Sequence, residues 1–250
     1  MPSPTVEGAN DAAPRCPPHT VLMSSWLERR LDREGPRGLS LTLWVVAVIV
    51  CALAFAGLTW DVLAHGPISR TDPRIESFVV RHRVGWVTDL ASSATWMGSG
   101  LLLIPLIVGV GGYVLLRHHD WRPLVTLGVG LGGVTALYYA AKELVDRGRP
   151  PASMRVGPPF ASGSFPSGHS AEAAAVYGVL AILAVSIMSR HRWLPVLGAV
   201  LIVLMVGVVR VYLGTHWPSD VLAGYALGGA WLGVVAAVTQ CMWPRHRRAA

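Results

Sequence analysis

Three short segments of the sequence carry cations, histidines and small polar residues at spacings that suit chemistry on a phosphate group. They are KELVDRGRP at 142–150, PSGH at 166–169 and RVYLGTHWPSD at 210–220. Each segment lies at the edge of a long apolar run, where an ionisable side chain is costly to keep. Ionisable side chains in that position indicate a functional site by default.

The cations and the small residues of these segments predict an anion site. Lys142, Arg149 and Arg210 supply three positive charges. A guanidinium matches the planar arrangement of phosphate oxygens, whereas an ammonium acts as a point charge. Ser167 and Gly168 come directly before an apolar run that we expect to be helical, and a helix N-terminus offers backbone N–H groups and a positive dipole to an anion.

The two histidines differ in their neighbours, and this difference predicts their roles. Asp220 follows His216 by four residues, and Pro218 suits the first position of a helix. We therefore expect Asp220 to lie in the first helical turn and to orient the His216 ring, leaving the second ring nitrogen as a nucleophile. His169 would then donate a proton to the leaving oxygen.

Taken together, the three segments resemble the signature of the type 2 phosphatidic acid phosphatase superfamily. The matching patterns are Lys-x6-Arg-Pro, Pro-Ser-Gly-His and Arg-x5-His-x3-Asp, and the resemblance covers residues from about 98 to 244. It implies a six-helix membrane phosphatase with no metal and no cofactor. It also implies a phosphohistidine on His216, with Asp220 orienting the ring and His169 as the general acid. The substrate-binding residues that it implies are Lys142, Arg149, Pro150, Ser167, Gly168 and Arg210.

One position departs from this pattern. The family often has serine before the arginine of the third segment, and here that residue is Val209. Because valine has no polar atom in its side chain, the departure removes one phosphate contact and leaves the reaction intact. We therefore expect Val209 to lie outside the site.

The composition predicts a membrane protein. Of the 250 residues, 52% are hydrophobic and only 14% are charged, with a mean hydropathy of +0.48; soluble domains carry about 25% charged residues. Six runs contain no Asp, Glu, Lys or Arg and are long enough to cross a bilayer as helices. They are 38–60, 90–116, 123–141, 173–189, 193–209 and 221–244.

The predicted fold class is therefore an all-α bundle of six transmembrane helices. Residues 65–97 are too polar to span the bilayer, and their apolar residues recur at helical spacing with a break at Gly85. This pattern predicts one or two amphipathic helices in the membrane interface; an ordinary extracellular loop is the alternative. The predicted domain of residues 38–244 lies between a flexible cytosolic tail, 1–37, and a basic cytosolic tail, 245–250.

The distribution of cations predicts the orientation in the plasma membrane. Six spans place both termini on one side, and that side holds twelve basic residues against nine on the other. The positive-inside rule then makes both termini cytoplasmic and places all three segments at the extracytoplasmic face. Cys16, Cys51 and Cys241 show no pairing or metal-ligand spacing.

The expected partners are the lipid bilayer and a phosphorylated lipid. The net charge of +7 comes from scattered arginines, so we exclude nucleic acid. The favoured substrate is undecaprenyl diphosphate; the alternatives are phosphatidylglycerol phosphate, phosphatidic acid and diacylglycerol diphosphate. Two other classes are a vanadate-dependent haloperoxidase, which six spans disfavour, and a lipid-binding protein without catalysis, which would need no His216–Asp220 pair.

The remaining ionisable residues receive structural interpretations. Arg147 and Arg155 match no motif position and are expected to be solvated loop charges, with Glu143 and Asp146 balancing them. Glu172 is expected to stabilise a helix start through the helix dipole. Five other histidines lack partners at a useful spacing and are expected to be surface or interface residues; they are His65, His82, His118, His119 and His191.

Overall fold

The structure is a computed structural model that describes residues 38–158, 162–188 and 190–242. The predicted N-terminal tail, 1–37, and C-terminal tail, 245–250, lie outside the described residues. The site and the helices that carry it lie within the compact unit that begins at Leu43.

Within the described residues, six helices are long and apolar enough to cross a membrane, which confirms the predicted fold class. They are α2 (Gly38–Leu63), α5 (Gly100–His118), α6 (Arg122–Val145), α7 (Gly168–Ile187), α8 (Trp193–Tyr212) and α9 (Pro218–Met242). Shorter helices lie between them, namely α3 (Pro67–Arg81), α4 (Gly85–Ala94), η1 (Thr95–Gly98) and η2 (Ala152–Met154). The chain is therefore a multi-pass membrane protein.

The predicted start of the second span is wrong by ten residues. Residues 90–98 contain no charge, but they form the end of α4 and the 3-10 helix η1 rather than part of α5. The chain changes direction at Ser99, whose extended backbone precedes α5 and whose side chain accepts a hydrogen bond from the Leu101 amide. An N-cap thus sets the boundary that the absence of charge could not.

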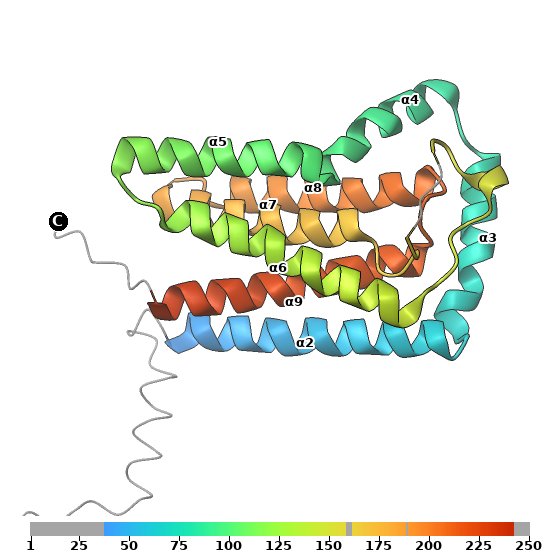
Figure 1. Cartoon of the computed structure of the whole chain (residues 1–250), viewed down its shortest axis with the longest axis horizontal. Coiled ribbons are helices and arrows are strands. Elements are labelled where there is room, and N and C mark those ends of the chain that lie inside the picture. The colour runs from blue at the N-terminus through green and yellow to red at the C-terminus, as the bar shows by residue number, and fades with distance from the viewer. Residues whose placement is uncertain (1–37, 159–161, 189, 243–250) are drawn as a thin grey trace, which may run out of the picture. The chain divides into compact units, whose positions relative to one another are not determined.

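The segment between the first two spans forms the two amphipathic helices that the sequence predicts. Figure 1 shows α3 crossing the ends of the long helices, with α4 leading back to α5. The break between them lies at residues 82–84, and Gly85 begins α4 instead of interrupting a helix.

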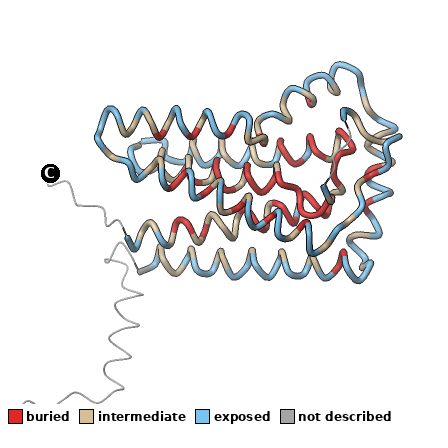
Figure 2. The backbone as a smooth tube through the Cα atoms, viewed as in Figure 1, coloured by how far each residue is buried: buried red, intermediate tan, exposed pale blue. Residues whose placement is uncertain are grey.

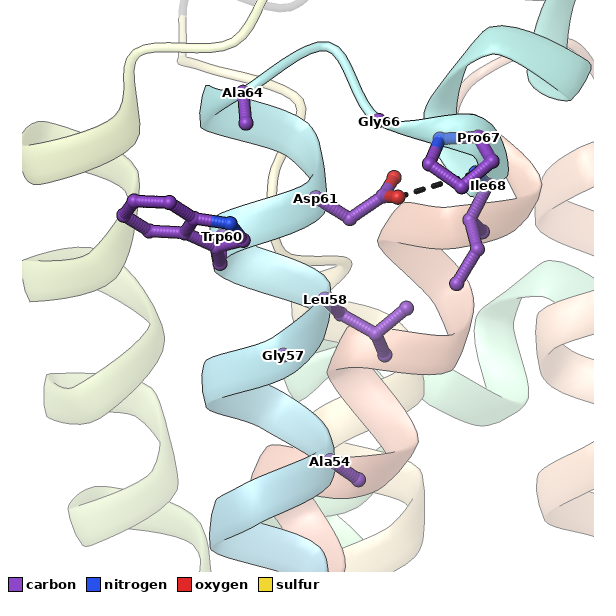
Figure 3. Close-up of a pocket in the computed structure, with 9 residues that line it drawn as sticks. All are labelled: Ala54, Gly57, Leu58, Trp60, Asp61, Ala64, Gly66, Pro67 and Ile68. Carbon is purple, nitrogen blue, oxygen red and sulfur yellow. Dashed lines mark hydrogen bonds between the residues drawn. The ribbon is translucent and has the colours of Figure 1, made fainter.

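The side chain of Asp61 fixes the turn from α2 into α3. It accepts hydrogen bonds from the amides of Ile68 and Ser69, at 3.2 and 2.7 Å, in the first turn of α3. Asp61 lines a pocket of about 460 Å³ between the end of α2 and the start of α3. Figure 3 draws the residues that line it. The residues that line this cavity, between Ala54 and Ile68, lie outside the three motif segments.

The core of the bundle joins five helices and is centred on α7 and α9. One buried residue from each helix represents it: Leu103, Leu127, Val176, Val206 and Val235. In Figure 2 the buried stretches concentrate on α7, on parts of α9 and at the bundle end that faces α3. That end holds the polar segments considered next.

Two glycines bring α9 into backbone contact with α7. A methyl group added at Gly224 would lie 2.5 Å from the carbonyl oxygen of Ser167, and one added at Gly228 would lie 2.5 Å from that of Ala171. Real side chains do not tolerate such contacts, so glycine is required at both positions for this approach. The close packing places the N-terminus of α9 beside that of α7.

Candidate active site

The three motif segments lie at the same end of the bundle, although they are far apart in sequence. Lys142 is in the last turn of α6, and Arg210 is in the last turn of α8. The second segment begins α7, and the third leads into α9. Because successive helices run in opposite directions, the ends of α6 and α8 meet the beginnings of α7 and α9 (Figure 1).

Lys142 and Arg149 point at the same backbone oxygen. The Nζ atom of Lys142 donates to the carbonyl of Gly163 at 2.5 Å, and Nη2 of Arg149 donates to it at 3.2 Å. A second donor of Arg149, Nη1, bonds the carbonyl of Thr215 at 2.7 Å. Burial lowers the pKa of the Arg149 guanidinium from its usual value. The two cations are therefore held together in a poorly solvated position that favours an anionic ligand.

Arg210, in the last turn of α8, is the third cation of this group. Its side chain is buried, and Nη1 donates to the hydroxyl of Thr95 in η1 at 2.9 Å. Arg210 interacts electrostatically with Arg149, His169 and His216. All three predicted cations thus act on one region of the structure.

The N-terminus of α7 meets the prediction in part. Ser167 is the N-cap, as the sequence indicates, and it is fully buried. Its amide, however, donates to the carbonyl of Asp220 at 3.0 Å, so it is used to join α7 to α9. The first helical amides, those of Gly168 and His169, have no acceptor within the helix and are the ones suited to bind an anion.

His216 lies in the loop before α9, with its two ring nitrogens facing different groups. Nδ1 is 3.6 Å from Oδ2 of Asp220, and Nε2 is 3.3 Å from Nη1 of Arg149. His216 is only 2% exposed. Burial, followed by the charges of Arg210, Arg149 and Lys142, lowers the pKa of His216 well below its usual value. The imidazole is therefore neutral at physiological pH, which a nucleophile requires.

The loop that carries His216 depends on one glycine. Gly214 has φ +67°, and a methyl group there would lie 2.1 Å from the carbonyl oxygen of Met154. The amide of Val156 donates to the carbonyl of Leu213 at 2.8 Å. The loop between α6 and α7 therefore packs directly on the turn that presents His216.

His169 is the second residue of α7 and is half-buried. It interacts electrostatically with Arg210, His216, Arg149 and Lys142. The backbone of η1 packs closely on it, since a methyl group on Gly98 would lie 3.0 Å from its Cβ atom. The structure thus brings both motif histidines and the three cations together, as the spacing of the motifs predicts.

The interpretation of Arg147 as a solvated loop charge is wrong. Its side chain is 15% exposed, and Nη1 lies 2.6 Å from Oδ1 of Asp220. Nη2 lies 2.7 Å from Oδ2 of Asp72, a fully buried residue of α3. The one feature of the sequence that could have indicated a role for Arg147 is its position two residues before Arg149. Asp72 belongs to no motif, so only the fold reveals it.

The interpretation of Glu172 as a helix-dipole residue is incomplete. Its carboxylate is buried and accepts hydrogen bonds from the hydroxyls of Thr135 and Tyr138, each at 3.0 Å. Both donors lie on α6, so Glu172 joins α7 to α6 behind the motif. The tyrosine ring of this pair also lies 3.1 Å from the Cβ position of Gly168.

The other residues singled out from sequence have simpler places. Pro150 is buried directly after Arg149, and without an N–H group it can only fix the backbone there. Val209 is buried in an apolar cluster with Ala91 and Leu213. Five histidines are exposed, as predicted; they are His65, His82, His118, His119 and His191.

Within 38–158, 162–188 and 190–242, no group of three or more His, Cys, Asp or Glu residues could hold a metal ion.

Comparisons with known proteins agree on one family. The model of the PAP2 superfamily matches residues 123–245. Phosphatidylglycerophosphatase B of Bacillus subtilis is 35% identical over 164 residues, which cover 64% of this chain and 79% of that protein. Lipid A 1-phosphatase of Rhizobium johnstonii is 34% identical over 230 residues, which cover 85% of this chain and 86% of that protein.

A solved structure agrees with the fold. The crystal structure of a transmembrane PAP2 type phosphatidylglycerolphosphate phosphatase from Bacillus subtilis superposes with a TM-score of 0.74. The identity is 30%, and the match covers 80% of this chain and 98% of that one.

Proposed function

We propose, from the premise that this chain belongs to the PAP2 superfamily of membrane lipid phosphatases, that it hydrolyses a phosphorylated lipid through a phosphohistidine on His216. One observation carries the assignment of residues. A buried imidazole, kept neutral by its surroundings, lies among three cations at one end of a transmembrane bundle. A neutral nucleophile beside fixed positive charge suits attack on an anionic phosphorus centre.

The proposed reaction has two steps. In the first, Nε2 of His216 attacks phosphorus, the bond from phosphorus to the lipid oxygen breaks, and His169 gives that oxygen a proton. The ring of His216 then carries positive charge, with its Nδ1–H group directed at Oδ2 of Asp220. In the second step, water loses a proton to His169 and attacks phosphorus, and the bond to Nε2 breaks. Phosphate leaves and both histidines return to their starting state.

The cations act on the charge that develops during both steps. Lys142, Arg149 and Arg210, with the amides of Gly168 and His169, would surround the phosphoryl oxygens. Such donors help most where charge increases on approach to the transition state, because they are already positioned.

The variant Arg149→Lys tests the geometry of this group. It keeps the positive charge but loses the planar fork that now spans the carbonyls of Thr215 and Gly163. We expect turnover to fall about tenfold or more, by analogy with the loss of single oxyanion donors. Steady-state kinetics on a lipid phosphate measures this, with Arg74→Lys on the exposed face of α3 as the control. Unchanged turnover would show that Arg149 is only structural.

The substrate follows less directly from the site. Undecaprenyl diphosphate, favoured from the sequence, remains a prediction. Phosphatidylglycerol phosphate, already an alternative from the sequence, gains support because a relative and a solved structure that this chain resembles are both named for it. Lipid A is a further candidate from the same reasoning. All of these present a phosphate on a lipid anchor, which a site at the bundle end can reach from the membrane.

Phosphate release from a panel of lipids in detergent tests the proposed function. The panel contains undecaprenyl diphosphate, phosphatidylglycerol phosphate, phosphatidic acid and lipid A, each with and without excess EDTA. We expect turnover of at least one lipid at the same rate in EDTA, since the mechanism uses only protein groups and water. Activity that is lost in EDTA and restored by magnesium would contradict the mechanism.

We also propose that the site faces outward and that both termini are cytoplasmic, on the basis of the twelve cations assigned to the inner side. A cysteine placed at Ser153, in the loop beside Arg149, should react with an impermeant maleimide in intact cells. A cysteine placed at Ala249, outside the described residues, should react only after lysis. The native cysteines are removed in both cases. Reaction of both from outside would contradict the proposed orientation.

A further inference from the structure

Beyond the three motifs, a chain of buried ion pairs links the interfacial helix α3 to the carboxylate that faces His216. The guanidinium of Arg147 bridges Asp72 and Asp220, at N–O distances of 2.7 and 2.6 Å. The side chains of the two aspartates are 1% and 0% exposed. A guanidinium is the side chain suited to this bridge, because its donors can bind two carboxylates at once.

The two carboxylate oxygens of Asp220 have different hydrogen-bond partners. Oδ1 is bound by Arg147 at 2.6 Å. Oδ2 accepts from the amide of Trp217 at 2.9 Å and from the hydroxyl of Ser164, and it is the oxygen that faces Nδ1 of His216. By holding Oδ1, Arg147 fixes the rotation of the carboxylate and keeps Oδ2 directed at the imidazole.

Asp72 in turn fixes Arg147 and the start of α9. Its Oδ1 accepts from the amide of Ser219 at 3.1 Å, and its Oδ2 accepts from the Ser219 hydroxyl at 2.5 Å. The hydroxyl of Ser219 is also contacted by Nη1 of Arg147, at 2.7 Å. The carboxylate thus lies at the N-terminus of α9, where the helix dipole favours a negative charge.

The charges explain why both partners are needed. A buried carboxylate is costly unless it is paired and hydrogen-bonded, and Arg147 is the cation in contact with Asp220. When Nε2 of His216 bonds to phosphorus, the ring becomes positive, and an ionised, correctly rotated Asp220 stabilises it. Loss of Arg147 or of Asp72 would leave that carboxylate less well oriented during the attack.

We infer that Arg147 and Asp72 are positioning residues for the nucleophile, acting on His216 through Asp220. This inference rests on the proposed function, in which His216 forms the phosphohistidine. The interfacial helix α3 therefore supplies part of the catalytic machinery from outside the three motif segments.

The test uses Arg147→Lys and Asp72→Asn in the full-length enzyme. Lysine keeps the charge but cannot bridge two carboxylates, and asparagine keeps the shape of Asp72 but not its charge. We expect kcat to fall about tenfold to a hundredfold, because small displacements of reacting groups lower rates by such factors. KM should change less than about twofold. Phosphoenzyme formation should slow by the same factor with p-nitrophenyl phosphate as with a lipid. Arg74→Lys and Asp89→Asn, at exposed positions, are the controls.

A double-mutant cycle separates positioning from a merely structural role. In an Asp220→Asn background, adding Asp72→Asn should lower kcat by less than about twofold, because Asp72 acts on His216 only through Asp220. An equal loss from Asp72→Asn in both backgrounds would overturn the inference, as would wild-type kcat in both single variants or a change confined to KM. Size-exclusion chromatography checks folding; if Asp72→Asn does not fold, the same cycle is run with Arg147→Lys. If the wild-type enzyme forms no phosphoenzyme, the proposed function fails instead.

Discussion

Replacing His216 with alanine should remove the covalent phosphoenzyme and nearly all turnover. The imidazole supplies the atom that bonds phosphorus, and the cations that remain can bind substrate but cannot replace that bond. We expect turnover to fall about a thousandfold or more, as it does when a catalytic nucleophile is deleted elsewhere. Labelled phosphate should be retained on the wild-type protein after an alkaline quench and lost in acid, and it should be absent from the variant.

The matched control for this variant is His118→Ala, which removes an exposed histidine in the last turn of α5. It should be labelled like the wild-type protein. Retained label in His216→Ala would place the nucleophile elsewhere and would contradict the proposed mechanism directly.

Replacing His169 with alanine should produce a loss that depends on the leaving group. A general acid contributes about 10² to 10⁴ in rate when the leaving oxygen is a poor one, such as a lipid alkoxide. p-Nitrophenolate needs little protonation, so the first step should stay fast with that ester. We therefore expect a burst of p-nitrophenolate and accumulation of the phosphohistidine, since the same residue also activates water in the second step.

Rapid-quench kinetics on both substrates measures this difference. His216→Ala should show no burst with either substrate, whereas His169→Ala should show one with the p-nitrophenyl ester alone. Equal deficits of His169→Ala on the good and the poor leaving group would show that His169 does not donate the proton.

The parts of the fold that could be predicted are those that depend only on residues close together in the sequence. A run of about twenty uncharged residues specifies a transmembrane helix wherever it occurs, because the bilayer imposes that length. Pro218 likewise marked the start of α9, which begins there. Residues 90–98 show the limit, since an uncharged stretch can also form a short helix and a turn outside the span.

The candidate site divides in the same way. The proximity of His169, His216 and the three cations could be predicted because each belongs to a motif at the same end of the bundle, while their roles in catalysis stay a prediction. Arg147 could not be interpreted correctly, since its role depends on a carboxylate that is 75 positions away in the sequence. Asp72 and Glu172 are similar cases, because the partners that explain a buried carboxylate lie on other helices.

The contact between α7 and α9 has a consequence for how the two histidines are held. Gly224 and Gly228 place the two backbones against each other, and the Ser167 amide joins them again through the carbonyl of Asp220. His169 is the second residue of α7, and His216 lies two residues before the start of α9. The distance between the proposed nucleophile and the proposed general acid is therefore set by main-chain contact between α7 and α9, which glycine at positions 224 and 228 allows. The two histidines are thus held by one pair of helices, whereas Lys142 and Arg210 lie on two others, α6 and α8.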